Sequence, residues 1–280
     1  MNPEPLWIEF CGNTVELNCP EGDLRDTLKR LLVHCLVDNG SKQVVSTYHV
    51  SMPEPEQVRV ERDGEEVYNG RLAGWVVLYV LQNLTSALTG NCRQALNFHS
   101  AGLAWQEKGI LLCGASGSGK STLTAWLTGS GFQFLTDELV GVTVENWRMT
   151  GLPRPIHLKP GSVFVLEHWL GEQARSQIDL LADGSALVLP SAFVRTEVVH
   201  TVAPEIVVFP KYSAQAEFRW QRLTTGQTAF QLAHSLVNAI NLPGHGMSQV
   251  VALSKRVTGY SVEFALPRHV AEWLDSLIPR

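Results

Sequence analysis

A glycine-rich stretch near the middle of the chain has the pattern of a phosphate-binding loop. Residues 114–121 read Gly-Ala-Ser-Gly-Ser-Gly-Lys-Ser and fit the Walker A pattern G-x-x-x-x-G-K-[ST]. The apolar run at 109–113 is typical of a buried strand, and residues 121–127 are typical of a helix start. Such a turn directs backbone N–H groups and the positive end of a helix toward one anion, which predicts a nucleotide phosphate site. The residues expected to contact the phosphates are Gly114, Ala115, Ser116, Gly117, Ser118, Gly119, Lys120, Ser121 and Thr122.

Several side chains could perform chemistry at this loop. Lys120 is expected to reach the β- and γ-phosphates, and the Ser121 hydroxyl is expected to coordinate Mg²⁺. Asp137 and Glu138 follow a short apolar stretch and begin 17 positions after Lys120. Because a triphosphate site needs an acidic partner for Mg²⁺, this pair predicts a metal ligand, Asp137, and a base for proton transfer. Interacting carboxylates can share these roles, so which acid is the base stays open.

The elements around the loop indicate a mixed α/β protein. Residues 95–105 and 109–113 are expected to form a hairpin that carries His99 on the strand leading toward the loop. Residues 172–192 are polar and are expected to be irregular, as either a surface excursion or a lid. Further strands are expected at 132–135, 139–144, 206–209, 218–223 and 257–266, and helices at 225–240, with Thr225 as a cap, and at 269–277.

The first part of the chain predicts a separate small α/β region. A hairpin is expected at 5–20, strands at 43–50 and 57–61, and helices at 23–37 and 72–88. No constellation of catalytic side chains is apparent in this part. We therefore expect two domains, a small N-terminal α/β region at 1–90 and a catalytic domain with the loop at 91–280.

The composition argues against several other classes of function. The 280 residues carry a formal net charge of −5, so no general attraction to nucleic acid or to an anionic membrane is expected. There is no run of about 18 apolar residues and no basic, apolar leader, so neither a membrane span nor a secretion signal is expected. The five cysteines form no C-x-x-C pair, which favours reduced thiols and a cytoplasmic location.

The stretch from His99 to Val144 resembles HPr kinase/phosphorylase, and more closely the HPr-kinase-related bacterial proteins. The similar pieces are the His99 strand, the hairpin into the glycine-rich loop, the short helix, and the Gly-Phe-Gln-Phe-Leu-Thr-Asp-Glu segment that ends at Glu138. The segment Pro-Arg-Pro-Ile-His-Leu-Lys at 153–159 is also similar. The resemblance implies a P-loop kinase domain of the HPr-kinase and PEP-carboxykinase type over 91–280, an α/β fold on a mixed α+β sheet.

The resemblance also implies an activity and its residues. It implies an ATP-dependent kinase that uses Mg²⁺ and acts on a serine hydroxyl, with His99, Lys120 and the acidic pair as catalytic residues. The general base of the family falls on Glu138, and Asp137 takes the first acidic position. Where the family has a later catalytic arginine, this chain has at best Lys211. An additional Mg²⁺-binding glutamate of the family has no clear counterpart near 156–163.

Three functions stay open on the sequence. The first is transfer of the ATP γ-phosphate to a hydroxyl of a protein, a peptide or a small molecule. The second is a nucleotide-binding regulatory module, and the third is an NTPase without kinase activity. The chain has neither a Leu-Ser-Gly-Gly-Gln signature nor an Asn-Lys-x-Asp motif, which argues against the transporter and GTPase types.

The acceptor side of the site is less defined. An acceptor pocket is expected from 153–160, 172–192 and 241–248. In the first of these segments, Arg154, His157 and Lys159 either approach the phosphates or belong to a structural loop. A homo-oligomer also stays open.

Overall fold

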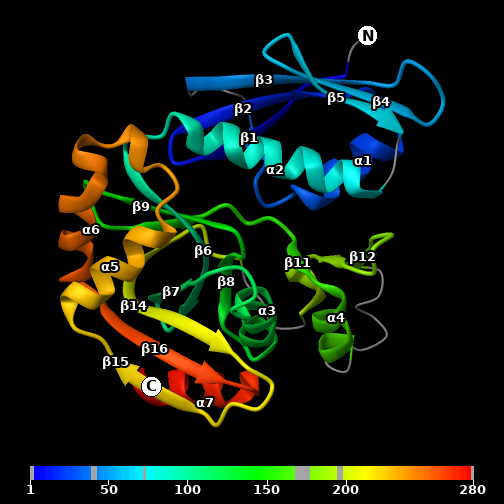
Figure 1. The fold of residues 1–280 in the computed structure, drawn as a ribbon. Helices are drawn as coiled ribbons and strands as arrows, with labels where there is room; N and C mark the ends of the chain where they lie inside the picture. The colour runs from blue at the N-terminus through cyan, green and yellow to red at the C-terminus, as the bar shows by residue number, and fades with distance from the viewer. Residues whose placement is uncertain (1–2, 39–42, 72–73, 168–176, 194–197, 279–280) are drawn as a thin grey trace. The chain divides into compact units, whose positions relative to one another are not determined.

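The computed structural model describes residues 3–38, 43–71, 74–167, 177–193 and 198–278. The chain divides into two compact units, Met1–Cys92 and Arg93–Arg280. The protein is a mixed α/β protein with several sheets, and both units combine helices with strands (Figure 1). None of the helices in the described ranges is long and apolar enough to cross a membrane.

The N-terminal unit is built on a five-stranded sheet whose strands lie in sequence order. The strands are β1 (Leu6–Phe10), β2 (Asn13–Asn18), β3 (Gln43–Ser51), β4 (Gln57–Arg62) and β5 (Glu65–Arg71), and the helices are α1 (Asp23–Leu31) and α2 (Gly74–Gly90). β2 and β3 are parallel, and the other neighbours are antiparallel. Alternate residues such as Ile8, Val15 and Leu17 are buried, which is the period that a strand needs to cover a core.

The first helix is shorter than its sequence pattern predicts. α1 ends at Leu31, and the expected continuation to Val37 is wrong. The chain after α1 turns back onto β1, where the Val37 N–H donates to the Trp7 carbonyl over 3.0 Å. Leu32 and Cys35, whose spacing suggested a helix, are buried in this return. Pairing with a strand edge has therefore overridden the local helical pattern.

The C-terminal unit is built on an eight-stranded mixed sheet (Figure 1). Its strands are β6 (Ala95–Trp105), β7 (Lys108–Cys113), β8 (Gln133–Thr136), β9 (Leu139–Thr143), β10 (Met149–Gly151), β14 (Thr201–Tyr212), β15 (Arg219–Arg222) and β16 (Thr258–Phe264). The order is β10-β9-β6-β7-β14-β16-β15, and β8 pairs with β6. β7, β14 and β16 are parallel, whereas β6 and β7 form the expected antiparallel hairpin.

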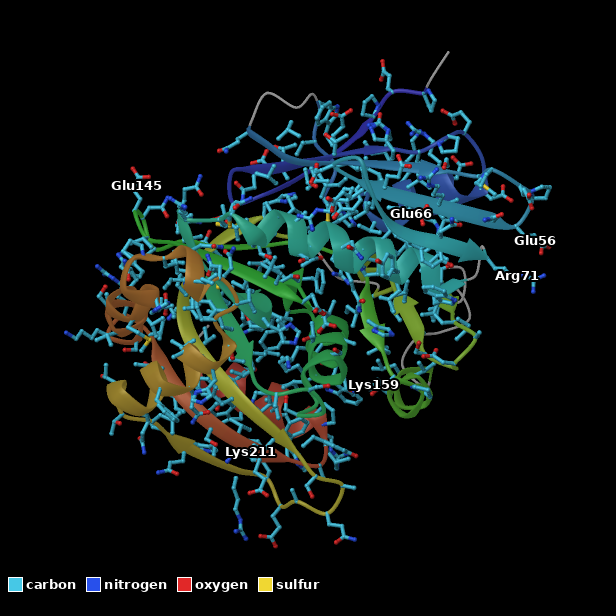
Figure 2. All side chains as sticks on the ribbon, turned by 45° about the horizontal axis from the view of Figure 1, so that its top comes forward. Glu56, Glu66, Arg71, Glu145, Lys159 and Lys211 are labelled. Carbon is cyan, nitrogen blue, oxygen red and sulfur yellow. The ribbon has the colours of Figure 1, made fainter. Side chains whose placement is uncertain are left out.

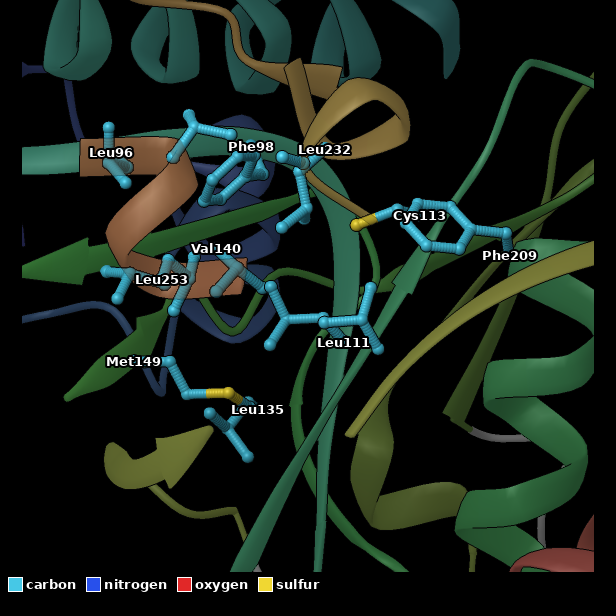
Figure 3. Close-up of a cluster of buried hydrophobic side chains, with 14 of the residues drawn as sticks. Leu96, Phe98, Leu111, Cys113, Leu135, Val140, Met149, Phe209, Leu232 and Leu253 are labelled. Atoms are coloured by element: carbon cyan, nitrogen blue, oxygen red, sulfur yellow. The ribbon is translucent and has the colours of Figure 1, made fainter. Parts of the chain in front are cut away.

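Helices cover both faces of this sheet, and the central strands are buried on both sides. The helices are α3 (Lys120–Gly129), α4 (Pro160–Glu167), α5 (Thr225–Ser235), α6 (Met247–Ser254) and α7 (Pro267–Leu277). Leu111 of β7 packs into a core with Leu232 of α5 and Leu253 of α6, as Figure 3 shows. The next residue, Leu112, packs into a second core with Leu123 of α3 and residues of α7. Burial on both faces explains why β7 is apolar from Gly109 to Cys113 instead of alternating.

The segment after β10 contains a small second sheet. Its strands are β11 (Ile156–Leu158), β12 (Ile178–Leu180) and β13 (Ala186–Val188), in the order β11-β13-β12. The expectation of an irregular segment is therefore wrong at 178–180 and 186–188, where β12 and β13 form, and residues 172–176 lie outside the described residues. The apolar side chains of β11 and β13 pack against Ala125 of α3 and Phe134 of β8, which gives these short strands a core.

Helix α5 begins and ends where side chains cap it. Thr224, not the expected Thr225, is the N-cap, and it forms a reciprocal capping box with Gln227. The helix ends at Ser235, so the expected extension to residue 240 is wrong. Beyond it, the buried Asn238 side chain accepts from the Asn97 N–H and donates to the Ala95 carbonyl, over 3.0 and 2.9 Å. These two bonds hold the segment after α5 against β6 and leave no room for a continuing helix.

Asn238→Ala is expected to lower the free energy of unfolding by roughly 2–4 kcal/mol, because it leaves a buried N–H and a buried carbonyl of β6 without partners. Urea unfolding monitored by circular dichroism measures this change. Ser248→Ala removes an exposed hydroxyl that bonds only to Gln249, and it serves as the control with an effect within about 0.5 kcal/mol. Equal unfolding midpoints for the two variants would show that Asn238 does not anchor this segment.

Candidate active site

The glycine-rich loop joins the end of β7 to the start of α3. The Ser118 N–H donates to the Ala115 carbonyl over 3.2 Å, and Gly119, with a φ of +88°, precedes the first helical residue. A Cβ at Gly119 would lie 2.9 Å from the Tyr212 Cβ, so glycine is needed between the loop and the end of β14. The Tyr212 N–H donates to the Ser118 carbonyl over 3.1 Å. The neighbouring strand therefore holds the loop in its bend.

Lys120 is the first residue of α3, and its side chain folds back over the loop. Its Nζ donates to the carbonyls of Gly114 and Ala115, over 2.5 and 3.2 Å. Burial is the main cause that lowers the pKa of Lys120, and the negative charge of Asp137 opposes this shift. A buried cation beside a helix start and a turn of backbone amides is suited to bind a phosphate oxygen.

The acidic pair follows β8 in a turn that Thr136 organises. The Thr136 hydroxyl donates to the Leu152 carbonyl and accepts from the Glu138 N–H, over 2.6 and 3.2 Å. The Glu138 carbonyl accepts from the Ser100 N–H of β6 over 3.2 Å. Ser100 pairs with Cys113, the last residue of β7, so the acidic turn and the glycine-rich loop lie at the same end of the sheet.

Asp137 is buried against the first turns of α3. It is 4% exposed, and the hydroxyls of Ser121 and Thr124 lie beside its carboxyl group. Burial raises the pKa of Asp137 to about 7; the charge of Glu138 adds to the rise, and the hydroxyls and Lys120 oppose it. The Asp137 Oδ1 atom is buried and has no hydrogen-bond partner among the described residues. Because an unsatisfied buried oxygen is costly, this atom is suited to receive a cation.

The Walker A pattern implies a divalent cation, and the residues present fit it. The unpartnered Asp137 Oδ1 and the Ser121 hydroxyl are hard oxygen donors of the kind that Mg²⁺ prefers. In the described ranges, no group of three or more His, Cys, Asp and Glu side chains could hold a metal ion. Mg²⁺ commonly takes few protein ligands and completes its shell with phosphates and water, so two protein oxygens are sufficient.

Glu138 differs from its neighbour in exposure and in charge. Its side chain is 36% exposed, and its Oε1 lies 3.3 Å from the Nδ1 of His99 on β6. Burial acts to raise the pKa of Glu138, but the hydrogen bond from His99 and the positive charge of Arg154 together lower it. The two adjacent carboxyls therefore titrate in different pH ranges, with Glu138 ionised at neutral pH. An ionised and accessible carboxylate can accept a proton from a bound hydroxyl group.

The segment between β10 and α4 brings two cations to this end of the sheet. Arg154 is 3% exposed and is close enough to Glu138 to lower the pKa of that acid. Lys159, labelled in Figure 2, donates from its Nζ to the Ser116 hydroxyl over 3.3 Å. His157 is engaged with the small sheet instead, where its Nε2 lies 3.2 Å from the Ser185 Oγ. Of the three basic residues in this segment, Arg154 and Lys159 therefore lie at the candidate site, and His157 belongs to the small sheet.

The backbone of Lys211 lies at the same end of the sheet. Lys211 is the next-to-last residue of β14, which runs parallel to β7. Its side chain forms no hydrogen bond or ion pair within the described part of the chain. Lys159 and Lys211, both labelled in Figure 2, come from different elements, the first from the chain before α4 and the second from β14. The catalytic role expected for Lys211 stays a prediction.

The segment after α5 reaches the strand that carries His99. Leu236 forms a bridge with Phe98, and the Val237 N–H donates to the Asn97 carbonyl over 2.8 Å. Residues 241–248, expected to line an acceptor pocket, follow directly after this contact. The contribution of residues 241–248 to an acceptor pocket stays a prediction.

Three hydroxyl residues of the site were not identified from the sequence. Thr124 lies one helical turn after Lys120 beside Asp137, and this spacing could have indicated it. Thr136 organises the acidic turn, as a threonine just before an acidic pair can. The Ser162 Oγ lies 2.7 Å from the Thr122 Oγ1, a contact between segments 40 residues apart that no local pattern signals.

Comparison with known proteins shows a distant structural similarity. No family model matches the chain, and no curated protein matches it. Among solved structures, the chain is similar to the Hpr(Ser) kinase/phosphatase from Coxiella burnetii, with a TM-score of 0.32 and 13% sequence identity. The match covers 65% of this chain and 95% of the other. The similarity is weak and lies at the level of the fold.

Proposed function

We propose that this protein is an ATP-dependent kinase that transfers the γ-phosphate to an alcohol group, with a serine-type hydroxyl as the expected acceptor. One observation supports the proposal above the others. A glycine-rich loop with a buried lysine and a pair of carboxyls with separated pKa values lie at one end of one sheet. Phosphoryl transfer needs these three parts together, a phosphate cradle, a metal ligand and a base.

The proposed roles follow from the surroundings of each side chain. The backbone of residues 114–122 and the Lys120 ammonium bind the phosphates of ATP. The Ser121 hydroxyl and Asp137 would hold Mg²⁺, which neutralises charge on the phosphate oxygens when bound. Of the two acids, Asp137 suits the metal because its free oxygen is buried, and Glu138 suits the proton because it is ionised and accessible. Lys211 is a further expected catalytic residue.

These residues account for the bond that forms, the bond that breaks and the proton that moves in the transfer step. The acceptor oxygen forms a bond to the γ-phosphorus, and the bond from the γ-phosphorus to the bridging oxygen of ADP breaks. The proton of the acceptor hydroxyl goes to the Glu138 carboxylate, whose Oε1 is held by His99 at 3.3 Å. His99 orients this carboxylate and can relay the proton to solvent, since its own side chain is 45% exposed.

Glu138→Gln is expected to lower kcat by about 10²–10⁴-fold, because glutamine keeps the shape of the side chain but cannot accept the proton. Binding of Mg²⁺ and ATP should stay within a few-fold of wild type, since the proposed metal ligand is Asp137. Single-turnover rates and calorimetric titration with a slowly hydrolysed ATP analogue measure the two quantities. Loss of metal-dependent binding together with turnover would instead place Glu138 on the metal.

Incubation with γ-labelled ATP and extract of the host cells tests the proposed function. Label on a protein, a peptide or a small hydroxyl compound supports a kinase, and mass spectrometry of the product identifies the acceptor. Release of free phosphate alone would indicate an NTPase, and neither product would indicate a nucleotide-binding regulatory module. The labelled product should be absent when Lys120→Ala replaces the wild-type protein.

A further inference from the structure

Lys159 contacts the glycine-rich loop from outside the loop and its helix. It lies between β11 and α4, and its Nζ donates to the Ser116 hydroxyl over 3.3 Å. A second contact three residues later joins the same segment to the first turn of α3, where the Ser162 Oγ lies 2.7 Å from the Thr122 Oγ1. The two contacts hold the start of α4 beside the loop, so the position of Lys159 does not depend on one surface bond.

Two lysines from different elements therefore contact the same short loop. The Lys120 Nζ lies on the carbonyls of Gly114 and Ala115, and Lys159 holds the next residue, Ser116. Like charges repel, and in the described ranges no carboxylate forms an ion pair with Lys159. This arrangement suits a polyanion that contacts both ammonium groups.

We propose that Lys159 is a second phosphate-binding cation of the active site and contacts the γ-phosphate of ATP. This inference rests on the proposed kinase function and assigns it a further catalytic residue. Contact with the γ-phosphate is favoured over contact with the inner phosphates because Lys159 binds the first part of the loop, directly after β7. The Lys120 ammonium lies at this part as well. The last part of the loop leads into α3, whose N-terminus is suited to bind the inner phosphates. A cation on the transferred group stabilises the charge that develops there.

Lys159 and Lys211 differ in their contacts with the loop. Lys211 has no hydrogen bond or ion pair in the described part of the chain, whereas Lys159 already touches a loop residue. Arg154 is buried near Glu138 and acts on that acid. Lys159 is therefore an exposed cation that already contacts the loop, and rotation of its own side chain can move its ammonium from Ser116 to a bound triphosphate.

The test compares ATP with ADP. Lys159→Ala is expected to weaken binding of a slowly hydrolysed ATP analogue by about tenfold or more and binding of ADP by less than about twofold. It should lower kcat by about 10²-fold, and Lys159→Arg should restore most of the binding and part of the rate. Fluorescent ATP and ADP analogues with Mg²⁺ measure the affinities, and single-turnover labelling measures the rate.

Lys108→Ala, which removes an exposed lysine at the far end of β7, is the control for the lost charge and should change neither affinity. Equal weakening of ATP and ADP, or no weakening of either, would overturn the role at the γ-phosphate. If the wild type binds ATP and transfers phosphate, and Lys159→Ala does both equally well, this inference alone is overturned. A wild-type protein that binds no ATP would overturn the proposed function itself, and this inference with it.

Discussion

Lys120→Ala is expected to abolish ATP turnover and to leave the fold intact, with a loss in kcat of at least about 10³-fold. The Lys120 ammonium is buried and held at the loop by the carbonyls of Gly114 and Ala115, where the phosphates are expected. Without it, the charge that develops on the transferred group loses a counter-charge in a site with little water. Initial rates of ADP release at saturating ATP and Mg²⁺ measure the effect.

The fold should persist because alanine is a strong helix former at the first position of α3, and because the lost hydrogen bonds lie within the loop. Circular dichroism and the urea midpoint check this. Lys108→Ala is the matched control, since Lys108 lies at the other end of β7 and pairs with Glu205 at 3.3 Å on the surface. Such a pair contributes at most about 1 kcal/mol. Equal rates of ADP release by the two variants would show that the Lys120 side chain of the loop takes no part in ATP turnover.

Asp137→Asn is expected to abolish activity and, without nucleotide, to stabilise the protein above pH 7. The pKa of Asp137 rises from 3.8 to about 7 on folding, mainly because the charged carboxyl is buried. The folded state therefore binds a proton that the unfolded state releases, and ionising Asp137 destabilises the fold. The full cost is about 4 kcal/mol above pH 7, and it disappears as the pH falls toward 4. Asparagine fills the same space without the charge, so it removes this cost.

Denaturant unfolding of wild type and variant at pH 4, 6 and 8 measures this difference. The free energies of unfolding should be alike at pH 4, and the advantage of the variant should grow up to pH 8. Mg²⁺ with an ATP analogue should stabilise the wild type and not the variant, since Asp137 is the proposed metal ligand. Glu138→Gln is the matched control because the pKa of Glu138 is lowered, so it should show no such gain. A variant less stable than wild type at pH 8 would contradict the assignment of Asp137 as a strained, buried carboxyl.

Local patterns predicted the elements around the loop well, because each is decided by residues close in sequence. The apolar run of β7, the glycines at positions that need a positive φ, and the start of α3 at Lys120 follow one another directly. The hairpin of β6 and β7 also follows from one short turn. The patterns were less accurate where distant segments compete for the same residues. Residues 35–37 pair with β1 instead of extending α1, and Asn238 binds β6 instead of extending α5.

The site shows the same division. The glycine-rich loop, its lysine and the acidic pair could be named from spacing alone, since the chemistry requires these residue types a short distance apart. The different surroundings of Asp137 and Glu138 could not, because adjacent carboxyls look equivalent until the fold buries one against α3 and places the other beside His99. Lys159 and Ser162 could not be ranked above Lys211 either, since their contacts with Ser116 and Thr122 join segments about 40 residues apart.

The sequence by itself determined that this chain carries a glycine-rich loop of the Walker A pattern between a buried strand and a helix, with an acidic pair after the next strand. These features depend on backbone conformation and on apolar period, which are properties of short segments. Only the tertiary structure decided which acid is buried, which cation contacts the loop, and which segment lies beside the His99 strand. Burial, charge and hydrogen bonding act through space, so they appear only when the sheet brings its strand ends together.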